Sequence, residues 1–253
     1  MSSVKNRLEE YLKELHLPTV RESFEEVAHK AGHEDLSYEQ YLLELVELES
    51  QVRRENRIQR LMRQSKLPLE KDMASFELKR LPAKVKRQVN TLLDGSFLDR
   101  RENILAFGNP GSGKTHLLCA IGQELIHNDR KVFFSSCQLM VQDLLIAKRD
   151  LQLSNLLKKL SRFDALILDD LGYVQQNREE MEVLFTLLAE RYERGSVMIT
   201  SNLPFSKWEA IFKDPMTTAA AIDRLVHHSV ILELNVPSYR VEQAKKERNE
   251  KPE

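Results

Sequence analysis

An apolar, strand-like run breaks into glycines and resumes as a helical pattern within the stretch Asn103–Leu118, NILAFGNPGSGKTHLL. Four residues of this stretch satisfy the pattern G-x-x-x-x-G-K-[ST] of a phosphate-binding loop: Gly108, Gly113, Lys114 and Thr115. The motif requires a strand before it and a helix after it, and the flanking apolar residues supply both patterns. The alternative, a glycine turn that happens to precede a lysine, does not explain that context. The chain is therefore predicted to contain a nucleotide-binding α/β domain.

Each residue type in this loop has a physical role toward a polyphosphate. Glycines let backbone N–H groups converge on the phosphates, and the positive end of the following helix faces the same anion. Lys114 supplies a charge for the β and γ phosphates, and Thr115 offers its hydroxyl to Mg²⁺. We expect ATP and Mg²⁺ as ligands, because the chain contains no N-K-x-D sequence that favours guanine. The predicted nucleotide-binding residues are Gly108, Asn109, Pro110, Gly111, Ser112, Gly113, Lys114, Thr115 and His116.

After the loop, short apolar runs alternate with helical patterns, which predicts a parallel sheet with helices on both faces. The predicted strands are Asn103–Phe107, Lys131–Ser135, Ala165–Asp169, Ser196–Thr200 and Ser229–Leu234. The expected fold class is therefore α/β with a five-stranded parallel sheet. Ligands of such sheets gather at the carboxyl ends of the strands, so polar residues there are candidate site residues.

The chain before this core has helical patterns throughout. Apolar residues recur at helical spacing over residues 4–15 and 20–28, and Ser37 with Gln40 forms a capping box that opens a long third helix. We expect this helix to end before Pro68. The predicted domains are a helical N-terminal domain (1–66), a basic linker with one short helix (67–101), the α/β core (102–236) and a C-terminal tail (237–253).

The net charge of -1 conceals an asymmetry along the chain. Residues 1–52 carry 5 basic and 12 acidic side chains, whereas residues 53–101 carry 14 basic and 6 acidic ones. The basic segment could touch a polyanion, and a solvated arginine-rich helix face explains the charge equally well.

The 2 cysteines form no C-x-x-C pair and no cluster with histidine, so neither a disulfide framework nor a zinc site is expected. A reduced, cytoplasmic protein fits this cysteine usage. The sequence has no apolar run of signal-peptide or membrane-span length, so we expect no membrane association.

Two carboxylates follow the third predicted strand. The run ALILDD delivers Asp169 and Asp170 to the carboxyl edge of the sheet, as in a Walker B motif. Asp169 is expected to hold Mg²⁺ together with Thr115, and Asp170 to orient or deprotonate the attacking water. An aspartate pair after a strand can instead cap a helix, but behind a phosphate loop the catalytic role is favoured. Because an aspartate is shorter than a glutamate, we expect slow hydrolysis.

Asn202 and Arg224 are further candidate catalytic residues. Asn202 follows the fourth predicted strand and could reach the γ-phosphate or the water, or it could simply open a turn. Arg224 lies on a helix before the last strand and could project into the ATP site of a neighbouring subunit. The alternative for Arg224 is a surface pair with Asp223. Arg191 and Arg194 are weaker candidates for the same intersubunit role.

A helical insertion separates the second and third predicted strands. Its leucines are expected to form buried faces: Leu144, Leu145, Leu151, Leu156, Leu157 and Leu160. Its basic side chains are expected to point outward and are candidate nucleic-acid contacts: Lys148, Arg149, Lys158, Lys159 and Arg162. They could follow a DNA backbone, and a solvated helix face is equally consistent with them. Elsewhere, Trp208 is expected to lie in the core, and His227 and His228 to be structural.

Five segments together resemble the IstB family of insertion-sequence ATP-binding proteins: GNPGSGKTHL, ALILDDLGY, ITSNLPFSKW, AAAIDRLVHHSVILELN and PSYR. That family belongs to the AAA+ ATPases and is similar to the helicase loader DnaC and the initiator DnaA. The resemblance implies that Asn202 is the first sensor, that Arg224 is the arginine finger, and that the helical insertion lines DNA. Residues 235–253 are too few for the usual helical lid, so we expect the lid to be missing or minimal and assign no second sensor.

The resemblance also implies a function. It implies a bacterial, nucleoid-associated ATPase that assembles as a homo-oligomer on duplex DNA, remodels it and assists the transposase encoded by the same element. An interaction adapter of the DnaC type, whose N-terminal helices grip a replicative helicase, is the alternative. A small-molecule kinase is less favoured, because the sequence offers no acceptor pocket beyond the nucleotide site.

Overall fold

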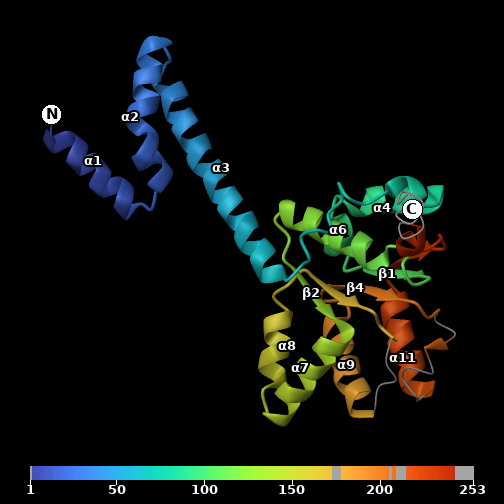
Figure 1. Cartoon of the computed structure of the whole chain (residues 1–253). Coiled ribbons are helices and arrows are strands. Elements are labelled where there is room, and N and C mark those ends of the chain that lie inside the picture. Colours follow the sequence, from blue (N-terminus) through green and yellow to red (C-terminus); the bar gives the residue numbers. More distant parts are fainter. Residues whose placement is uncertain (1, 173–177, 205–206, 209–214, 243–253) are drawn as a thin grey trace, which may run out of the picture. The chain divides into compact units, whose positions relative to one another are not determined.

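The computed structural model describes residues 2–172, 178–204, 207–208 and 215–242, with only the backbone described at 2–3, 215–218 and 220–221 (Figure 1). The chain divides into two compact units, Met1–Arg60 and Leu61–Glu253. The division falls inside the helix Tyr38–Ser65, near the end of which the predicted domain boundary lies. In the described part of the chain, no helix is long and apolar enough to cross a membrane.

The first unit contains α1 (Ser2–Glu14), α2 (Pro18–His33) and most of α3 (Tyr38–Ser65). The predicted capping box is confirmed: the Gln40 N–H donates to Ser37 Oγ over 3.2 Å, and the Ser37 N–H donates to Gln40 Oε1 over 2.8 Å. This reciprocal pair fixes the start of α3. The buried side chains of the unit are Leu12, Val20, Val27 and Leu45.

The second unit is built on a parallel sheet with the strand order β2-β3-β4-β1-β5. Its strands are β1 (Asn103–Gly108), β2 (Val132–Ser136), β3 (Ala165–Asp169), β4 (Ser196–Ser201) and β5 (Ser229–Leu234). Each strand agrees with its predicted bounds to within one residue, so the predicted five-stranded parallel sheet is confirmed. The β1 side chains Ile104, Leu105 and Ala106 are fully buried, because helices cover both faces of the sheet.

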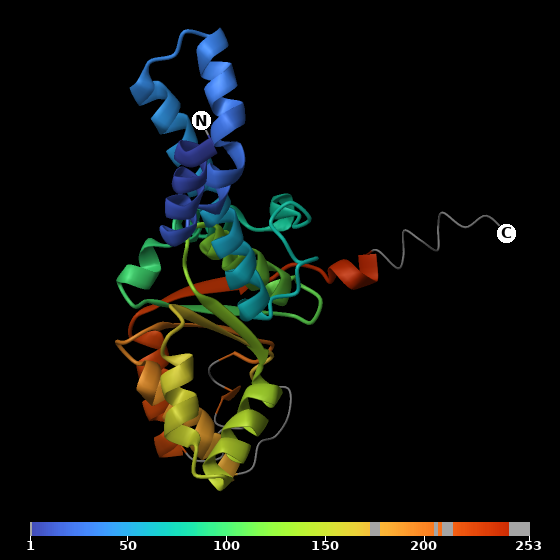
Figure 2. The same ribbon diagram turned by 90° about the vertical axis from the view of Figure 1, so that its left-hand side faces the viewer.

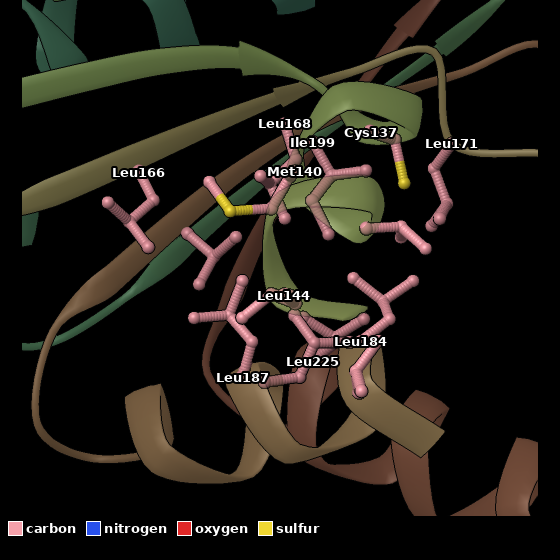
Figure 3. Close-up of a cluster of buried hydrophobic side chains, with 14 of the residues drawn as sticks. Cys137, Met140, Leu144, Leu166, Leu168, Leu171, Leu184, Leu187, Ile199 and Leu225 are labelled. Atoms are coloured by element: carbon pink, nitrogen blue, oxygen red, sulfur yellow. The ribbon is translucent and has the colours of Figure 1, made fainter. Parts of the chain in front are cut away.

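Helices form a layer on each side of the sheet (Figures 1 and 2). On one side lie α4 (Ala83–Leu92) and α6 (Lys114–His127). On the other side lie α7 (Cys137–Arg149), α8 (Leu153–Leu160), α9 (Arg178–Arg191) and α11 (Pro215–Val226). Figure 3 shows the apolar core between β3, β4 and the second layer, where Leu144, Leu187 and Leu225 converge from three helices. Trp208 belongs to the same core and is fully buried, as predicted.

The segment 67–101 belongs to the second unit and packs on its α/β core. It contains a 3-10 turn (Leu78–Arg80), α4 and the short helix α5 (Ser96–Asp99). Gln88 on α4 donates its side-chain N–H to the Ile231 carbonyl of β5 over 3.3 Å. The buried apolar side chains of the segment are Leu67, Leu81, Val85, Val89, Leu92, Phe97 and Leu98.

One leucine of the insertion does not follow the predicted pattern. Leu144 and Leu160 are buried, and Leu145, Leu156 and Leu157 are partly buried. Leu151 is 89% exposed and lies in the turn between α7 and α8. The prediction that Leu151 is buried was therefore wrong, because helical spacing was extended through a turn that separates two helices.

Arg191 is a buried structural residue, which rules out the predicted intersubunit role. Its guanidinium donates to the carbonyls of Phe163 (2.8 Å), Asp164 (2.9 Å) and Ser196 (2.9 Å), and so ties α9 to the ends of two strands. Burial lowers the pKa of Arg191 to about 10. A Cβ on Gly195 would collide with this guanidinium, so the adjacent glycine is needed to admit it.

Replacing Arg191 by methionine should lower the free energy of unfolding by about 2–3 kcal/mol, because three backbone carbonyls lose a charged donor. Chemical denaturation measures this loss. Arg194→Met is the matched control, since Arg194 is exposed and pairs only at the surface with Glu190. The control should change stability by less than about 0.5 kcal/mol. Equal stability of the two variants would contradict the structural role of Arg191.

Candidate functional site

The phosphate loop connects β1 to α6, and its shape depends on glycine. Gly111 and Gly113 have φ of 78° and 94°, in the left-handed region that favours glycine. A Cβ on Gly111 would collide with Ser238 Oγ, and one on Gly113 would lie 3.1 Å from the Phe76 ring. The loop therefore requires glycine both for its backbone conformation and for the close approach of two other segments.

Lys114 is the first residue of α6 and is buried, with 5% of its surface exposed. Its Nζ donates to the carbonyls of Gly108 over 2.9 Å and Asn109 over 3.0 Å, so the ammonium is held inside the loop. Burial lowers the pKa of Lys114, while the carboxylates of Asp170 and Asp169 oppose that shift. Beside it, the buried Ser112 Oγ has no hydrogen-bond partner among the described residues, which leaves a donor for a phosphate oxygen.

Three side chains meet at the carboxyl ends of β3 and β4. Thr115 Oγ1 and Thr200 Oγ1 both donate to the same oxygen of Asp169, Oδ1, each over 2.7 Å. Thr200 Oγ1 also accepts the Asp170 N–H over 2.8 Å. The predicted metal-binding pair, Thr115 and Asp169, is thus in direct contact, and the set of a hydroxyl and a carboxylate fits Mg²⁺. Thr200 was not predicted, although it is fully buried and bridges the two aspartates.

Replacing Thr200 by valine should reduce ATP hydrolysis or apparent Mg²⁺ affinity by about 10–100-fold, because Asp169 loses the donor that orients it. A Mg²⁺ titration of the hydrolysis rate at fixed ATP measures this. Thr200→Ser keeps the hydroxyl and is the matched control, which we expect to behave within a few-fold of the native protein. A valine variant with native Mg²⁺ dependence would show that Thr200 has no orienting role.

Asp170 follows β3 in a left-handed backbone conformation, with φ of 60°. Partial burial raises the pKa of its carboxyl above the ordinary value, and the neighbouring charge of Asp169 raises it further, while Lys114 opposes the shift. A raised pKa makes the carboxylate a stronger base than an ordinary aspartate. The strained position and the basicity both suit a residue that contacts reacting atoms.

A cavity of about 490 Å³ opens over the phosphate loop. Most of the predicted nucleotide-binding residues line it, together with the candidate catalytic residues Asp170 and Asn202. Gly108, Asn109 and Asp169 are not among the lining residues, but Gly108 and Asn109 accept hydrogen bonds from Lys114, and Asp169 accepts one from Thr115. The lining residues are Lys71, Ser75, Phe76, Glu77, Arg80, Leu81, Pro110, Gly111, Ser112, Gly113, Lys114, Thr115, His116, Asp170, Asn202, Val236, Tyr239 and Arg240.

The segment 71–81 forms one wall of the cavity, which sequence reasoning missed. His116 holds it: Nε2 lies 3.0 Å from the Asp72 carbonyl and 3.2 Å from Ser75 Oγ, and the ring stacks edge-on against Phe76 at 5.1 Å. Because the carbonyl of Asp72 can only accept, Nε2 carries the proton. His116, predicted as a nucleotide-binding residue, thus lines the cavity and also anchors its wall.

Residues 237–242 form another wall, although they were predicted to be tail. The Tyr239 N–H donates to the Gly111 carbonyl over 2.9 Å. Arg80 Nη2 donates to the Pro237 carbonyl over 3.0 Å and pairs with Glu242 Oε2 at 2.7 Å. These contacts place Arg240 at the cavity. The segment PSYR contributed to the family resemblance, but nothing in its local pattern indicated that it folds back onto the loop.

The charge of Arg240 acts on two site residues. It helps to lower the pKa of Lys114, and it also opposes the raised pKa of Asp170. The cavity is therefore lined by Arg240, from the segment after β5, as well as by Lys114 of the loop. Both cations would attract the phosphates of a bound nucleotide.

Arg224 lies on α11 and does not line the cavity of its own chain. Its guanidinium carbon is 4.8 Å from the centre of the Phe185 ring on α9, and its Nη1 is buried with no hydrogen-bond partner in the described part of the chain. Arg194, which like Arg191 was a weaker candidate for the intersubunit role, is exposed and pairs with Glu190 at 2.5 Å. The structure thus brings Asn202 to the cavity over the phosphate loop and leaves Arg224 away from it.

The five predicted nucleic-acid contacts are all exposed, on α7, α8 and just beyond. Lys148 pairs with Glu182 at 3.1 Å, and Arg149 pairs with Asp150 at 3.1 Å. Such surface pairs are weak and can exchange for other anions. Lys158, Lys159 and Arg162 follow in and after the last turn of α8.

The strand order, the phosphate loop and the carboxylates at the end of β3 define a P-loop protein of the AAA+ fold. Two solved structures share this fold. DnaA from Aquifex aeolicus, bound to AMPPCP, matches with a TM-score of 0.54 and 18% identity over 74% of this chain and 57% of that chain. The DnaC helicase loader matches with a TM-score of 0.51 and 16% identity over 65% of this chain and 97% of that chain.

The chain belongs to the IstB family, as the sequence resemblance predicted. The family model described as IstB-like ATP binding protein matches residues 10–247. An insertion sequence ATP-binding protein of Sinorhizobium fredii is 43% identical over 95% of this chain and 83% of its own length.

Proposed function

We propose that this protein is an ATPase that assembles head to tail as a homo-oligomer on duplex DNA, remodels the DNA and assists the transposase encoded by the same element. One observation carries the proposal. Arg224 does not line the cavity of its own chain, so a contact of its cation with a γ-phosphate would be with the ATP of a neighbouring subunit. The name of the Sinorhizobium relative, an insertion sequence ATP-binding protein, supports both ATP and the mobile-element context.

The site residues fit ATP and Mg²⁺. The triphosphate would bind the loop N–H groups, Lys114 and the free donor of Ser112, while the base would lie against the rings of Phe76 and Tyr239. Thr115 and Asp169 would hold Mg²⁺, which when bound neutralises charge on the β and γ oxygens. The cavity thus offers cations and hydrogen-bond donors for the phosphates and aromatic side chains for the base.

Hydrolysis follows from the residues beside the γ-phosphate. A water oxygen forms a bond to the γ-phosphorus as the bond from that phosphorus to the bridging oxygen breaks, and ADP leaves with the electron pair. Asp170 orients the water and accepts its proton, for which its raised pKa is suited. Asn202 contacts the γ-phosphate or the water from the end of β4. The short side chain of Asp170 makes this reaction slow.

Assembly depends on the γ-phosphate. Arg224 of one subunit stabilises the charge on the phosphate bound by the next, so hydrolysis removes that contact and loosens the interface. Because the two surfaces in such a contact differ, the assembly is a ring or a helix. The exposed cations of α8 follow the DNA backbone.

A helicase-loading adapter is the second candidate. It is favoured by the likeness to the DnaC helicase loader, of which this chain covers 97%. In that case the N-terminal unit, which exposes Val4 and Tyr11 on α1 and Leu15 just after it, would contact the helicase.

Fluorescence anisotropy with labelled duplex and single-stranded DNA separates the two candidates. We expect duplex binding that requires ATP and weakens with salt. A plot of log affinity against log salt concentration should have a slope of about -0.9 per neutralised phosphate. A preference for single strands together with ATP-dependent capture of the replicative helicase would support the adapter instead. Salt-insensitive binding would contradict contact with the DNA backbone.

A further inference from the structure

The segment 237–242 lines the cavity over the phosphate loop, although none of its side chains is buried. The chain is anchored up to Val236, which is 9% exposed. Beyond that residue, Tyr239 is 39% exposed and Val241 is 53% exposed. Burial of apolar surface therefore contributes little to holding this segment in place, and its position depends on polar contacts.

Arg80 makes several of these contacts with one side chain. Its Nη2 donates to the Pro237 carbonyl over 3.0 Å and to the Glu242 carboxylate over 2.7 Å. Its guanidinium carbon lies 5.0 Å from the centre of the Tyr239 ring. The side chain of Arg80 is 20% exposed, so water screens these contacts less than those of a fully exposed pair. Because Arg80 ends the segment 71–81, it joins two walls of the cavity.

The segment 237–242 also contacts the phosphate loop directly. The Tyr239 N–H donates to the Gly111 carbonyl over 2.9 Å, and Ser238 lies where a Cβ on Gly111 would be. The Tyr239 ring and the Arg240 cation both line the cavity. Displacement of the segment would therefore remove an aromatic side chain and a cation from the nucleotide site together.

We propose that Arg80 is a positioning residue that holds the segment 237–242 closed over bound nucleotide, and that its pair with Glu242 controls how fast the nucleotide dissociates. This inference rests on the ATP binding of the proposed function and requires neither DNA nor assembly. A nucleotide that contacts the closed segment binds less tightly when the segment opens. By linkage, bound nucleotide also stabilises the closed segment.

Stopped-flow dissociation of mant-ATP from the full-length protein, chased with excess unlabelled ATP in Mg²⁺, tests this role. Arg80→Met should raise the dissociation rate about tenfold, because the segment loses its charged donor. Arg80→Lys keeps a cation and should stay within about threefold of the native rate. Lys79→Met is the matched control, since Lys79 is an exposed cation of the same 3-10 turn and does not line the cavity. It should retain the native rate.

A second variant, Glu242→Ala, separates positioning from direct attraction of the phosphates. If Arg80 acted only by attracting phosphate, removal of the carboxylate beside it would slow dissociation. We expect the opposite, a rate raised about three- to tenfold, with the double variant no faster than Arg80→Met alone. Glu233→Ala is the matched control, because it removes an exposed carboxylate on β5 that does not line the cavity. This control should dissociate at the native rate.

Hydrogen exchange of peptides that cover 237–242 reports the segment itself. ATP should slow this exchange in the native protein and slow it much less in Arg80→Met. A native dissociation rate for Arg80→Met, or slower dissociation for Glu242→Ala, would overturn the inference. A lower melting temperature of nucleotide-free Arg80→Met with native dissociation would also overturn it, since Arg80 would then be structural. Failure of the native protein to bind mant-ATP would overturn the proposed function as well.

Discussion

Arg224→Ala should bind ATP with native affinity but hydrolyse it about 10³–10⁵ times more slowly, the effect expected for loss of an arginine finger. The reason is positional: Arg224 lies outside its own chain's cavity, so its removal leaves the lysine, hydroxyl and carboxylates of that cavity intact. Calorimetry gives the affinity, and phosphate release gives the rate. Arg194→Ala is the matched control, an exposed arginine that pairs with Glu190, and it should retain the native rate.

Mixing two inactive variants decides whether the site is shared. Arg224→Ala contributes an intact cavity, and Asp169→Asn contributes an intact Arg224, so a random equimolar assembly has both at about one interface in four. The mixture should therefore recover about a quarter of the native rate. If both variants fold and assemble and their mixture stays inactive, Arg224 does not act in trans.

Lys114→Ala should weaken ATP binding by about a hundredfold or more, because a buried ammonium is lost from the phosphate loop. Assembly that depends on ATP should disappear with it. Isothermal calorimetry measures the first effect and light scattering the second. Lys71→Ala is the matched control, since Lys71 lines the same cavity outside the loop, and its affinity should fall by much less. Native ATP binding by Lys114→Ala would contradict the assignment of the loop.

The parts of the structure that were predictable are those with a strong local pattern. The strands are short apolar runs, mostly buried in β1, β3 and β4 and partly exposed in the edge strands β2 and β5, so their bounds followed from the local apolar pattern. The phosphate loop has a fixed spacing, and its backbone conformation needs glycine at Gly111 and Gly113. The contact between Thr115 and Asp169 followed because the loop and the end of β3 meet at the same edge of the sheet.

The residues that were missed depend on segments distant in sequence. Phe76 lines the cavity on a segment that His116 contacts, and Arg240 lines it on a segment that Arg80 contacts. Contacts of this kind between distant segments leave no periodic pattern in the sequence. In the sequence, Thr200 is an ordinary residue of a buried strand, and only the structure shows its two hydrogen bonds to the aspartates. Leu151 was predicted to be buried because it is apolar. It is exposed because the chain turns at that point.

Electron microscopy of the protein with duplex DNA, with and without ATP, would show whether ATP drives head-to-tail assembly on DNA. We predict a head-to-tail ring or helix around or along the duplex only in the presence of ATP, with Arg224 of each subunit facing the ATP cavity of the next. Assemblies of the same form without ATP, or an interface in which Arg224 faces away from the neighbouring cavity, would contradict it.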